Sequence, residues 1–376
     1  MNRLIILFCL FLITACNQKK AESSTNISST SITPKYAEGF SVQLDGEYKW
    51  VTVKSPFQGA SSGFTYLLVP AGASVPAHTP DVKIIRTPIQ SIVCTSTTHI
   101  PLLDYLDESH KLVGFPSINY ISSTKTRAYV DAGKVKDVGI DKGMNLELLL
   151  ALKPELLMGY TMSADYGQFK KIEDLGIPVV INAEYLEKHP LGRSEWIKFM
   201  ALFFNKEQQA DSIFNVIEQN YLTTKLKAQT STHKPTVLCG IMYGDAWFLP
   251  GGENYSATIL KDASCEYLWA SDKSNGFLEL SFETVYERAH KADLWIGTAD
   301  FASLKHLESG DHRYARFNAV KQQNVYNYDA RKGAQGGSEF LELGYLRPDI
   351  ILKDLVKIGH PDLLPDHQLY FYRRLE

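Results

Sequence analysis

Two stretches of the sequence repeat the same arrangement around one glutamate. In "NLELLLALKPELLMG" and "SFETVYERAHKADLWIG", a capping residue (Asn145 or Ser281) and an apolar residue precede Glu147 or Glu283, and a helix and an apolar strand ending in Gly follow. The capping residues suit the N-cap position, which places each glutamate second in its helix. There a carboxylate can complement the helix dipole, accept a partner's guanidinium with both oxygens, or do both. The second copy is two residues longer between its glutamate and its later acidic residue.

A second set of candidate side chains lies in loops that follow apolar, strand-like runs. They carry aromatic rings, hydroxyls or a cation, and they are Thr97, Thr98, His99, Tyr120 and Tyr160 in the first half and Tyr243, Trp247, Phe248, Tyr328 and Arg331 in the second. Open α/β sheets bind ligands at the carboxyl ends of their strands, so these loops are expected to form the walls of a cleft. Such a surface suits a large, partly planar or chelated ligand held by stacking and hydrogen bonds. It suits a bare metal less well, because His99 is the one histidine in these loops.

Two other patterns suggest different chemistry. Ser96, His99 and Asp104 raise the alternative of a lipid-anchored α/β hydrolase, but the sequence lacks a G-x-S-x-G elbow, a P-loop, H-E-x-x-H and a Rossmann glycine motif. The glycine-rich "GAQGG" at 333–337 could cradle an anion, although such a loop alone is a weak signal. We therefore expect a binding protein without catalytic residues, resident metal or cofactor.

The elements that must position these loops alternate between strands and helices from Pro88 onwards, which predicts parallel sheets covered by helices. We expect an α/β fold with two Rossmann-like lobes, at 88–190 and 231–376. The first lobe has predicted strands at 91–94, 112–115, 156–158 and 179–181 and helices at 100–106, 146–152 and 166–175. The second has predicted strands at 237–241, 294–296 and 325–328 and helices at 256–262, 282–289 and 348–358.

A long amphipathic segment separates the two lobes, within a bridging region at 191–230. Ala210, Ile213, Phe214, Ile217 and Tyr221 recur at helical spacing, without an intervening Gly or Pro. This pattern predicts one helix of about 22 residues, roughly 33 Å long. Such a helix can act as a stiff strut, and the alternative is an ordinary packing helix of one domain.

The N-terminus has the composition of a secretory signal. Arg3 precedes an apolar run that is too short to span a bilayer, and "ITAC" resembles a bacterial lipobox ending at Cys16. We expect a signal peptide at 1–15, acylation of Cys16 and a flexible tether at 16–35, whereas the alternative is a secreted protein with an incidental Cys16. Residues 36–87 read as a β-rich extension, a hairpin or small meander, which we interpret as an appendage.

The composition limits the possible partners. The chain has 376 residues, a net charge of −3 and 44% hydrophobic residues, which is enough to build two cores and gives no basic surface for nucleic acid. Cys94 and Cys239 lie in strand-like runs and are expected to be buried small hydrophobic residues, and Cys265 is less clearly placed. A disulfide between two of these three cysteines stays open.

From Pro88 to its end, the chain resembles the substrate-binding proteins of ABC importers for iron complexes and cobalamin. The resemblance rests on "SIVCTSTTHIPLLDYL", "KLVGFP", "VDAGKVKDVGIDKGMNLELLLALKPELLMGY", "GIPVV" and "RPDIILKDL", in that order. It implies a ferric siderophore-like chelate bound between two lobes, with cobalamin or haem and then a bare transition metal as alternatives. It also implies that Glu147 and, less clearly, Glu283 dock into arginine pockets of a permease that works with an ATPase. We expect a monomer anchored by lipid to a bacterial membrane, facing the periplasm or the exterior.

Overall fold

The computed structural model describes residues 30–140, 143–162, 166–299 and 301–376. The predicted signal peptide, Cys16 and most of the predicted tether lie outside these residues. Within the described ranges, no helix is both long and apolar enough to cross a membrane.

The first lobe, called here the N-lobe, is built on a parallel sheet with strand order β12-β11-β6-β7-β8. Its central strands are apolar runs buried on both faces, as expected where helices cover both sides of a sheet. The strands are β6 (Ile92–Cys94), β7 (Leu112–Phe115), β8 (Lys136–Asp137), β11 (Leu156–Gly159) and β12 (Val179–Ile181), with a small pair, β9 (Gly139–Ile140) and β10 (Gly143–Met144), beside them. The helices are α1 (His99–Tyr105), α2 (Thr124–Asp131), α3 (Leu146–Leu152) and α4 (Gly167–Asp174).

The second lobe, the C-lobe, contains two sheets. The larger has the order β16-β13-β18-β19-β20 and is parallel except at its last pair, and the smaller is the antiparallel β14-β15-β17. The strands are β13 (Thr236–Cys239), β14 (Ile241–Tyr243), β15 (Ala246–Pro250), β16 (Glu266–Tyr267), β17 (Phe277–Leu280), β18 (Leu294–Ile296), β19 (Val325–Asn327) and β20 (Arg373–Arg374). The helices are α7 (Tyr255–Asp262), α8 (Phe282–Ala289), α9 (Leu304–Gly310), α10 (Asn318–Lys321), α11 (Glu339–Leu343) and α12 (Pro348–Gly359).

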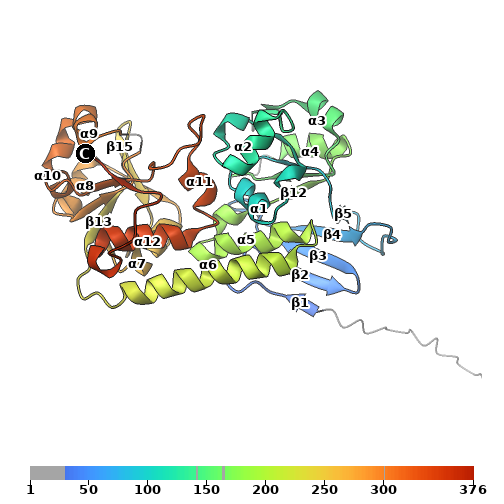
Figure 1. The fold of residues 1–376 in the computed structure, drawn as a ribbon, viewed down its shortest axis with the longest axis horizontal. Helices are drawn as coiled ribbons and strands as arrows, with labels where there is room; N and C mark the ends of the chain where they lie inside the picture. Colours follow the sequence, from blue (N-terminus) through green and yellow to red (C-terminus); the bar gives the residue numbers. More distant parts are fainter. Residues whose placement is uncertain (1–29, 141–142, 163–165, 300) are drawn as a thin grey trace, which may run out of the picture.

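Helix α6 (Glu207–Ala228) runs beneath both lobes (Figure 1). It has 22 residues, as predicted, and buries Ala210, Phe214, Ile217 and Tyr221. Helix α5 (Pro190–Leu202) from the N-lobe side and α12 from the C-lobe side both pack against it. The two lobes therefore share one helical base, and the predicted α/β fold class with two lobes and a bridging helix is confirmed.

The N-terminal segment forms a five-stranded sheet that is part of the main core. Its strands are β1 (Thr30–Ile32), β2 (Phe40–Asp45), β3 (Tyr48–Val53), β4 (Phe64–Pro70) and β5 (Lys83–Thr87), paired in that order. The Phe40 ring contacts the Trp196 ring of α5 at 4.9 Å between centroids, and the backbone N–H of Ile181 donates to the Tyr66 hydroxyl at 3.0 Å. The interpretation of this segment as an appendage is wrong, because the apolar face of its sheet is buried against α5 and the N-lobe.

Two buried carboxylates of the N-lobe hold the start of this segment. Glu195 accepts hydrogen bonds from the backbone N–H groups of three consecutive residues, Lys35, Tyr36 and Ala37, at 2.7–3.0 Å. Glu187 accepts from the next N–H groups and from the Trp196 indole. Because these donors would otherwise be buried without partners, the two carboxylates fix where the sheet joins the lobe.

Candidate functional site

A cavity of about 320 Å³, the N-lobe chamber, lies at the carboxyl ends of three parallel N-lobe strands. The turns after β6, β7 and β11 supply most of its wall, and the C-lobe supplies the rest. Its lining residues are Thr95, Ser96, Thr97, Phe115, Pro116, Ser117, Tyr120 and Tyr160 from the N-lobe, with Ser338 and Leu341 from the C-lobe. Parallel sheets of this kind place their ligand sites at this edge.

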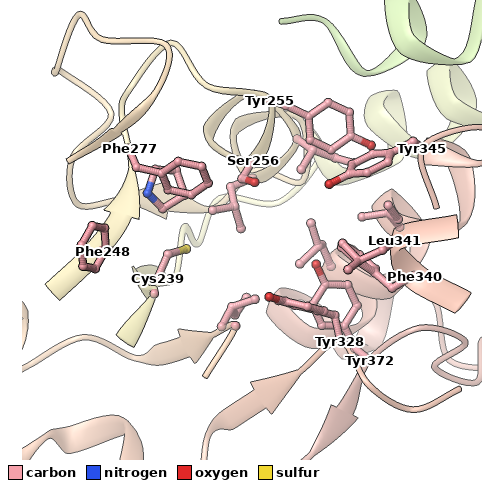
Figure 2. A pocket seen from close by; sticks show the side chains of 18 residues that line it. Cys239, Phe248, Tyr255, Ser256, Phe277, Tyr328, Phe340, Leu341, Tyr345 and Tyr372 are labelled. Atoms are coloured by element: carbon pink, nitrogen blue, oxygen red, sulfur yellow. The ribbon is translucent and has the colours of Figure 1, made fainter. Parts of the chain in front are cut away.

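A second cavity of about 270 Å³, the C-lobe chamber, lies at the carboxyl ends of β13, β18 and β19. In Figure 2, Phe340 and Leu341 of α11 face Phe248 and Phe277 across the space, and tyrosines line two further sides. The lining residues are Cys239, Gly240, Phe248, Pro250, Tyr255, Ser256, Ile259, Leu260, Phe277, Ile296, Gly297, Tyr328, Phe340, Leu341, Tyr345, Ile351, Leu355 and Tyr372.

The polar groups of the C-lobe chamber are mainly phenols. Burial raises the pKa of the Tyr255 and Tyr372 hydroxyls, so both stay neutral and can donate hydrogen bonds. The Tyr255 hydroxyl has no hydrogen-bond partner among the described residues. The Tyr328 ring stacks on the Phe340 ring at 4.6 Å between centroids. This wall can stack against a planar ligand and donate to its oxygen atoms.

Helix α11 borders both chambers. Its Leu341 side chain lines both cavities and is 44% exposed. The helix begins at Ser338, whose hydroxyl caps it by accepting the backbone N–H of Leu341. The two chambers therefore meet at this short helix.

The C-lobe segment that ends in α11 is fixed to the N-lobe backbone. Glu342 accepts hydrogen bonds from the backbone N–H groups of Ser122 and Ser123, each at 2.7 Å, and its residue is 2% exposed. Burial raises the pKa of the Glu342 carboxyl to about 8, although the two N–H donors act in the opposite direction. The loop at 333–337 packs here and does not form an open anion cradle, because a Cβ on Gly337 would lie 2.1 Å from the Tyr120 carbonyl oxygen.

An arginine lies where the helical base meets both lobes. The Arg193 guanidinium carbon lies 4.4 Å from the centre of the Tyr255 ring and 4.5 Å from that of Tyr345. Its Nη2 donates to the carbonyl of Tyr185 at 2.7 Å. Nearby, the buried Glu184 accepts from the Thr98 hydroxyl at 2.5 Å, and burial raises the Glu184 pKa. Thr98, a predicted loop hydroxyl, therefore has a partner within its own lobe.

Five predicted cleft residues line a chamber. These are Thr97, Tyr120 and Tyr160 in the N-lobe chamber and Phe248 and Tyr328 in the C-lobe chamber.

The predictions for His99 and Trp247 are wrong. His99 is fully buried as the first residue of α1, and Trp247 is fully buried on β15. The Trp247 ring packs 5.2 Å from Trp295, and its Nε1 donates to the Cys239 carbonyl at 3.0 Å. Neighbouring residues of a strand face opposite sides, so Phe248 lines the chamber and Trp247 enters the core.

Tyr243 and Arg331 line neither chamber. Tyr243 is 82% exposed at the end of β14, and its ring contacts Phe248 at 6.4 Å between centroids. The Arg331 guanidinium lies 4.1 Å from the centre of the Tyr370 ring. The predicted role of both in the cleft wall is therefore not supported by their positions.

The geometry does not produce a catalytic triad. Neither ring nitrogen of His99 has a hydrogen-bond partner among the described residues, and burial lowers its pKa to about 3. Asp104 instead accepts from the hydroxyls of Ser109, Ser123 and Thr126. The hydrolase alternative is rejected, because its base cannot contact either partner.

The paired glutamates occupy the predicted helical positions. Asn145 accepts from the N–H of Leu148 at 3.0 Å and caps α3, so Glu147 is its second residue. Ser281 caps α8 in the same way, so Glu283 is second there. Both glutamates are exposed, and the Glu283 carboxylate lies 3.9 Å from Arg313.

Sequence reasoning missed most of the C-lobe chamber wall. Tyr255, Tyr345 and Tyr372 lie on or beside helices and at the C-terminal end, and Phe340 and Leu341 lie on α11. The available signal was the "SEFLELGYL" stretch, whose apolar residues follow a capping serine. Cys94, Cys239 and Cys265 are free and buried, which confirms the expected burial of Cys94 and Cys239 and shows no disulfide among the three. Cys239 also lines the chamber.

Comparisons with known proteins agree with this architecture. A model of the periplasmic binding protein family matches residues 92–332. An uncharacterised lipoprotein of Methanocaldococcus jannaschii is 26% identical, over 95% of this chain and 89% of its own length. An uncharacterised ABC transporter substrate-binding lipoprotein of Bacillus subtilis is 23% identical, over 71% of this chain and 81% of its own. The periplasmic haem-binding protein HutB of Vibrio cholerae aligns with a TM-score of 0.55 and 17% identity, covering 70% of this chain and 99% of that chain.

Proposed function

Because this chain belongs to the periplasmic binding protein family, we propose that it captures an iron complex, a ferric siderophore-like chelate, between its lobes and delivers it to the permease of an ABC importer. Family membership confirms the family predicted from the sequence. Proteins of this family bind substrates for transport and are not enzymes.

The pair of adjoining chambers carries the proposal. Both lie at the carboxyl ends of parallel strands, one in each lobe, and both are lined by aromatic rings, aliphatic side chains and hydroxyls. Their volumes, about 320 and 270 Å³, together fall within the usual range for small-molecule sites. Rings such as Phe248 and the stacked Tyr328 and Phe340 can cover the apolar faces of a chelate, while hydroxyls donate to its oxygen atoms.

Ligand capture would proceed by limited closure of the two lobes. A continuous helix, α6, supports both lobes, and α5 and α12 pack along it. Such a base resists wide opening and favours a largely preformed cleft. We assign 88–190 and 231–376 as the lobes and 191–230 as the bridge between them.

Delivery would use the two exposed glutamates. We assign Glu147 and Glu283 as docking carboxylates for arginines of the permease, which works with its ATPase. A capped helix presents each carboxylate at a fixed place on a different lobe. A carboxylate oriented in this way can accept a guanidinium in bidentate fashion.

We further propose that the protein is a monomer anchored at the cell envelope through acylated Cys16. The predicted end of the tether at residue 35 is corrected to 29, because Thr30–Ile32 form β1 and the Lys35 N–H donates to Glu195. Relatives named as lipoproteins support the anchor. Radiolabelled palmitate should label the wild-type protein in cells and leave Cys16→Ser unlabelled. Labelling of Cys16→Ser at the wild-type level would remove the anchor assignment.

A titration of the purified protein tests the ligand class. Intrinsic fluorescence and thermal shift would be followed with a ferric tris(hydroxamate), haem, cobalamin and free Fe³⁺ and Zn²⁺. We expect the ferric chelate to bind and the free ions to leave both signals unchanged. If only haem or cobalamin binds, that compound replaces the ferric chelate as the proposed ligand, and the proposed role in transport is kept. Binding of a free ion alone would overturn the chelate proposal.

A further inference from the structure

We propose that Glu342 is the positioning residue that sets the size of the ligand site, because it holds α11 across the cleft and so keeps the two chambers apart. The proposal rests on the proposed function only in its reference to a ligand. Its structural part, a cross-lobe anchor that holds a partition in place, stands separately.

The anchor consists of hydrogen bonds between lobes. The two Glu342 oxygens each accept one backbone N–H, from Ser122 and from Ser123, at 2.7 Å. The carboxyl comes from α11 of the C-lobe, and the two serines precede α2 of the N-lobe. Loss of this carboxyl would leave two part-buried N–H donors without their partners, which should weaken the contact.

A close backbone approach beside Glu342 marks the same contact. A Cβ on Gly337 would lie 2.1 Å from the Tyr120 carbonyl oxygen, and a Cβ on Gly333 would lie 2.7 Å from the Ser122 Cα. Only glycine allows the C-lobe segment to approach the N-lobe backbone this closely. The contact therefore depends on two independent features, a buried acceptor and the absence of side chains.

Leu341, the residue that borders both chambers, is next to the anchoring residue Glu342. Leu341 precedes Glu342 in α11 and lines both chambers, so the two side chains project from one turn of one helix. If the Glu342 contact is released, α11 is no longer fixed to the N-lobe. Leu341 is then no longer held between the two cavities. The chambers of about 270 and 320 Å³ would then join into one larger site.

Removing the carboxyl, in Glu342→Ala, should raise the native-state hydrogen exchange of the Ser122 and Ser123 amides about tenfold or more. In Glu342→Gln, which keeps one acceptor oxygen, the exchange rates of these two amides should lie between those of the wild type and Glu342→Ala. Glu339→Ala is the matched control, since Glu339 is on the same helix and its carboxylate accepts from the Tyr370 hydroxyl of its own lobe. Equal exchange in wild type and Glu342→Ala would overturn the anchor.

The partition has a readout that needs no ligand. Cys239 lines the C-lobe chamber and is 5% exposed, whereas Cys94 is fully buried in β6. In the native, detergent-solubilised protein, the rate of maleimide modification at Cys239, mapped by mass spectrometry, should rise at least about tenfold in Glu342→Ala, with Cys94 unchanged. Gly337→Ala, which disturbs the contact sterically, should give the same result and serves if Glu342→Ala does not fold. An unchanged Cys239 rate in both variants would overturn the partition.

Ligand selectivity then links the partition to function. The probes are iron(III) tris(acetohydroxamate), small enough for one chamber, and a hexadentate ferric tris(hydroxamate) too large for one. Glu342→Ala should shift the ratio of their affinities towards the large chelate by about tenfold, whereas Glu339→Ala should not. An unchanged ratio would overturn the role in size selection. If the wild-type protein binds neither chelate, the ferric-chelate part of the proposed function fails, while the exchange and maleimide results still decide the anchor and the partition.

Discussion

The backbone N–H of Ser123 donates to the Glu342 carboxyl of the other lobe at 2.7 Å, while the Ser123 hydroxyl donates to Asp104 of its own lobe. One serine at the start of α2 thus lies between two carboxyl groups, and one of them comes from the opposite side of the cleft. We therefore expect the relative position of the lobes to depend on the protonation of Glu342.

The contact should weaken as pH rises. Glu342 faces Asp104 of α1 and Glu339 of its own helix, and Tyr105 and Lys125 line the same small cavity. With the contact formed, the pKa of the Glu342 carboxyl is raised from 4.5 to about 8, mainly by burial and then by the two carboxylates. A raised pKa means that formation of this contact takes up a proton. The favourable free energy that proton uptake adds to this contact is fully present below the usual carboxyl pKa of 4.5. It is lost as pH rises through about 8.

Fluorescence energy transfer can measure this change. Dyes on Lys134→Cys of the N-lobe and Lys305→Cys of the C-lobe, both exposed positions, report the distance between lobes. Transfer efficiency should change between about pH 6 and pH 9 in the wild type and stay constant in Glu342→Gln. A pH dependence that persists in Glu342→Gln would assign the effect to another group.

Trp247 and Phe248 should respond to truncation in opposite ways. Trp247→Ala removes a fully buried ring and is expected to cost about 3–5 kcal/mol of the free energy of unfolding, with little change in the affinity of the folded protein. Phe248→Ala should weaken ligand binding about tenfold, equivalent to about 1.4 kcal/mol, at a smaller cost in stability. Urea unfolding and ligand titration of both variants test this. The reverse result would place Trp247 in the site.

Reversing the Glu147 charge should separate binding from transport. Glu147→Lys is expected to leave ligand affinity near the wild-type value and to lower uptake by cells about tenfold or more, because a lysine repels permease arginines. Glu47→Lys makes the same charge change in the exposed turn before β3 and is the control. Normal uptake in Glu147→Lys would leave that carboxylate as a helix-dipole partner only.

The hydrogen bonds that Glu195 accepts at the start of the N-terminal segment should strongly stabilise the protein. Glu195→Ala leaves three backbone N–H groups without their acceptor and Lys198 without a buried partner, with an expected cost of about 3–5 kcal/mol. Asp211→Ala removes another carboxylate that pairs with Lys198, but from an exposed position, and should cost less than about 1 kcal/mol. Chemical denaturation compares the two. Equal costs would show that the ion pair, and not the buried acceptor, stabilises the junction.

Burial of His99 should make the protein less stable in acid. Its pKa falls from 6.5 to about 3 on folding, so the unfolded chain binds a proton that the folded chain does not. The folded state therefore loses stability as pH falls below about 6.5, by about 2 kcal/mol at about pH 5. His99→Leu should remove that part of the acid sensitivity, whereas His78→Leu, at an exposed position, should not. The measurement is the free energy of unfolding at about pH 5 and 7.5.

Much of the fold could be predicted because its helices and strands follow from residue patterns within short stretches of sequence. The periodicity of α6, the apolar runs of β7, β12 and β18, and the capping residues Asn145 and Ser281 are each contained in a short window of sequence. These signals do not depend on what the element packs against.

The wall of the cleft was predicted less well, because it depends on which side of an element a residue faces. Phe248 and Trp247 are adjacent aromatic residues in one loop-like stretch, and only the pairing of β15 with β14 and β17 puts one in the chamber and the other in the core. The histidine of "TSTTHIP" is predicted to lie in a loop, but it is the first residue of α1 and is fully buried.

The sequence by itself determined two α/β lobes, the stiff helix between them and the capped glutamates, since each follows from spacing along the chain. Only the tertiary structure decided that Glu342 joins Ser122 and Ser123 across the cleft and that Leu341 lies between two cavities. Those contacts unite residues about 220 positions apart, and their free energy comes from burial and backbone donors that no local window contains.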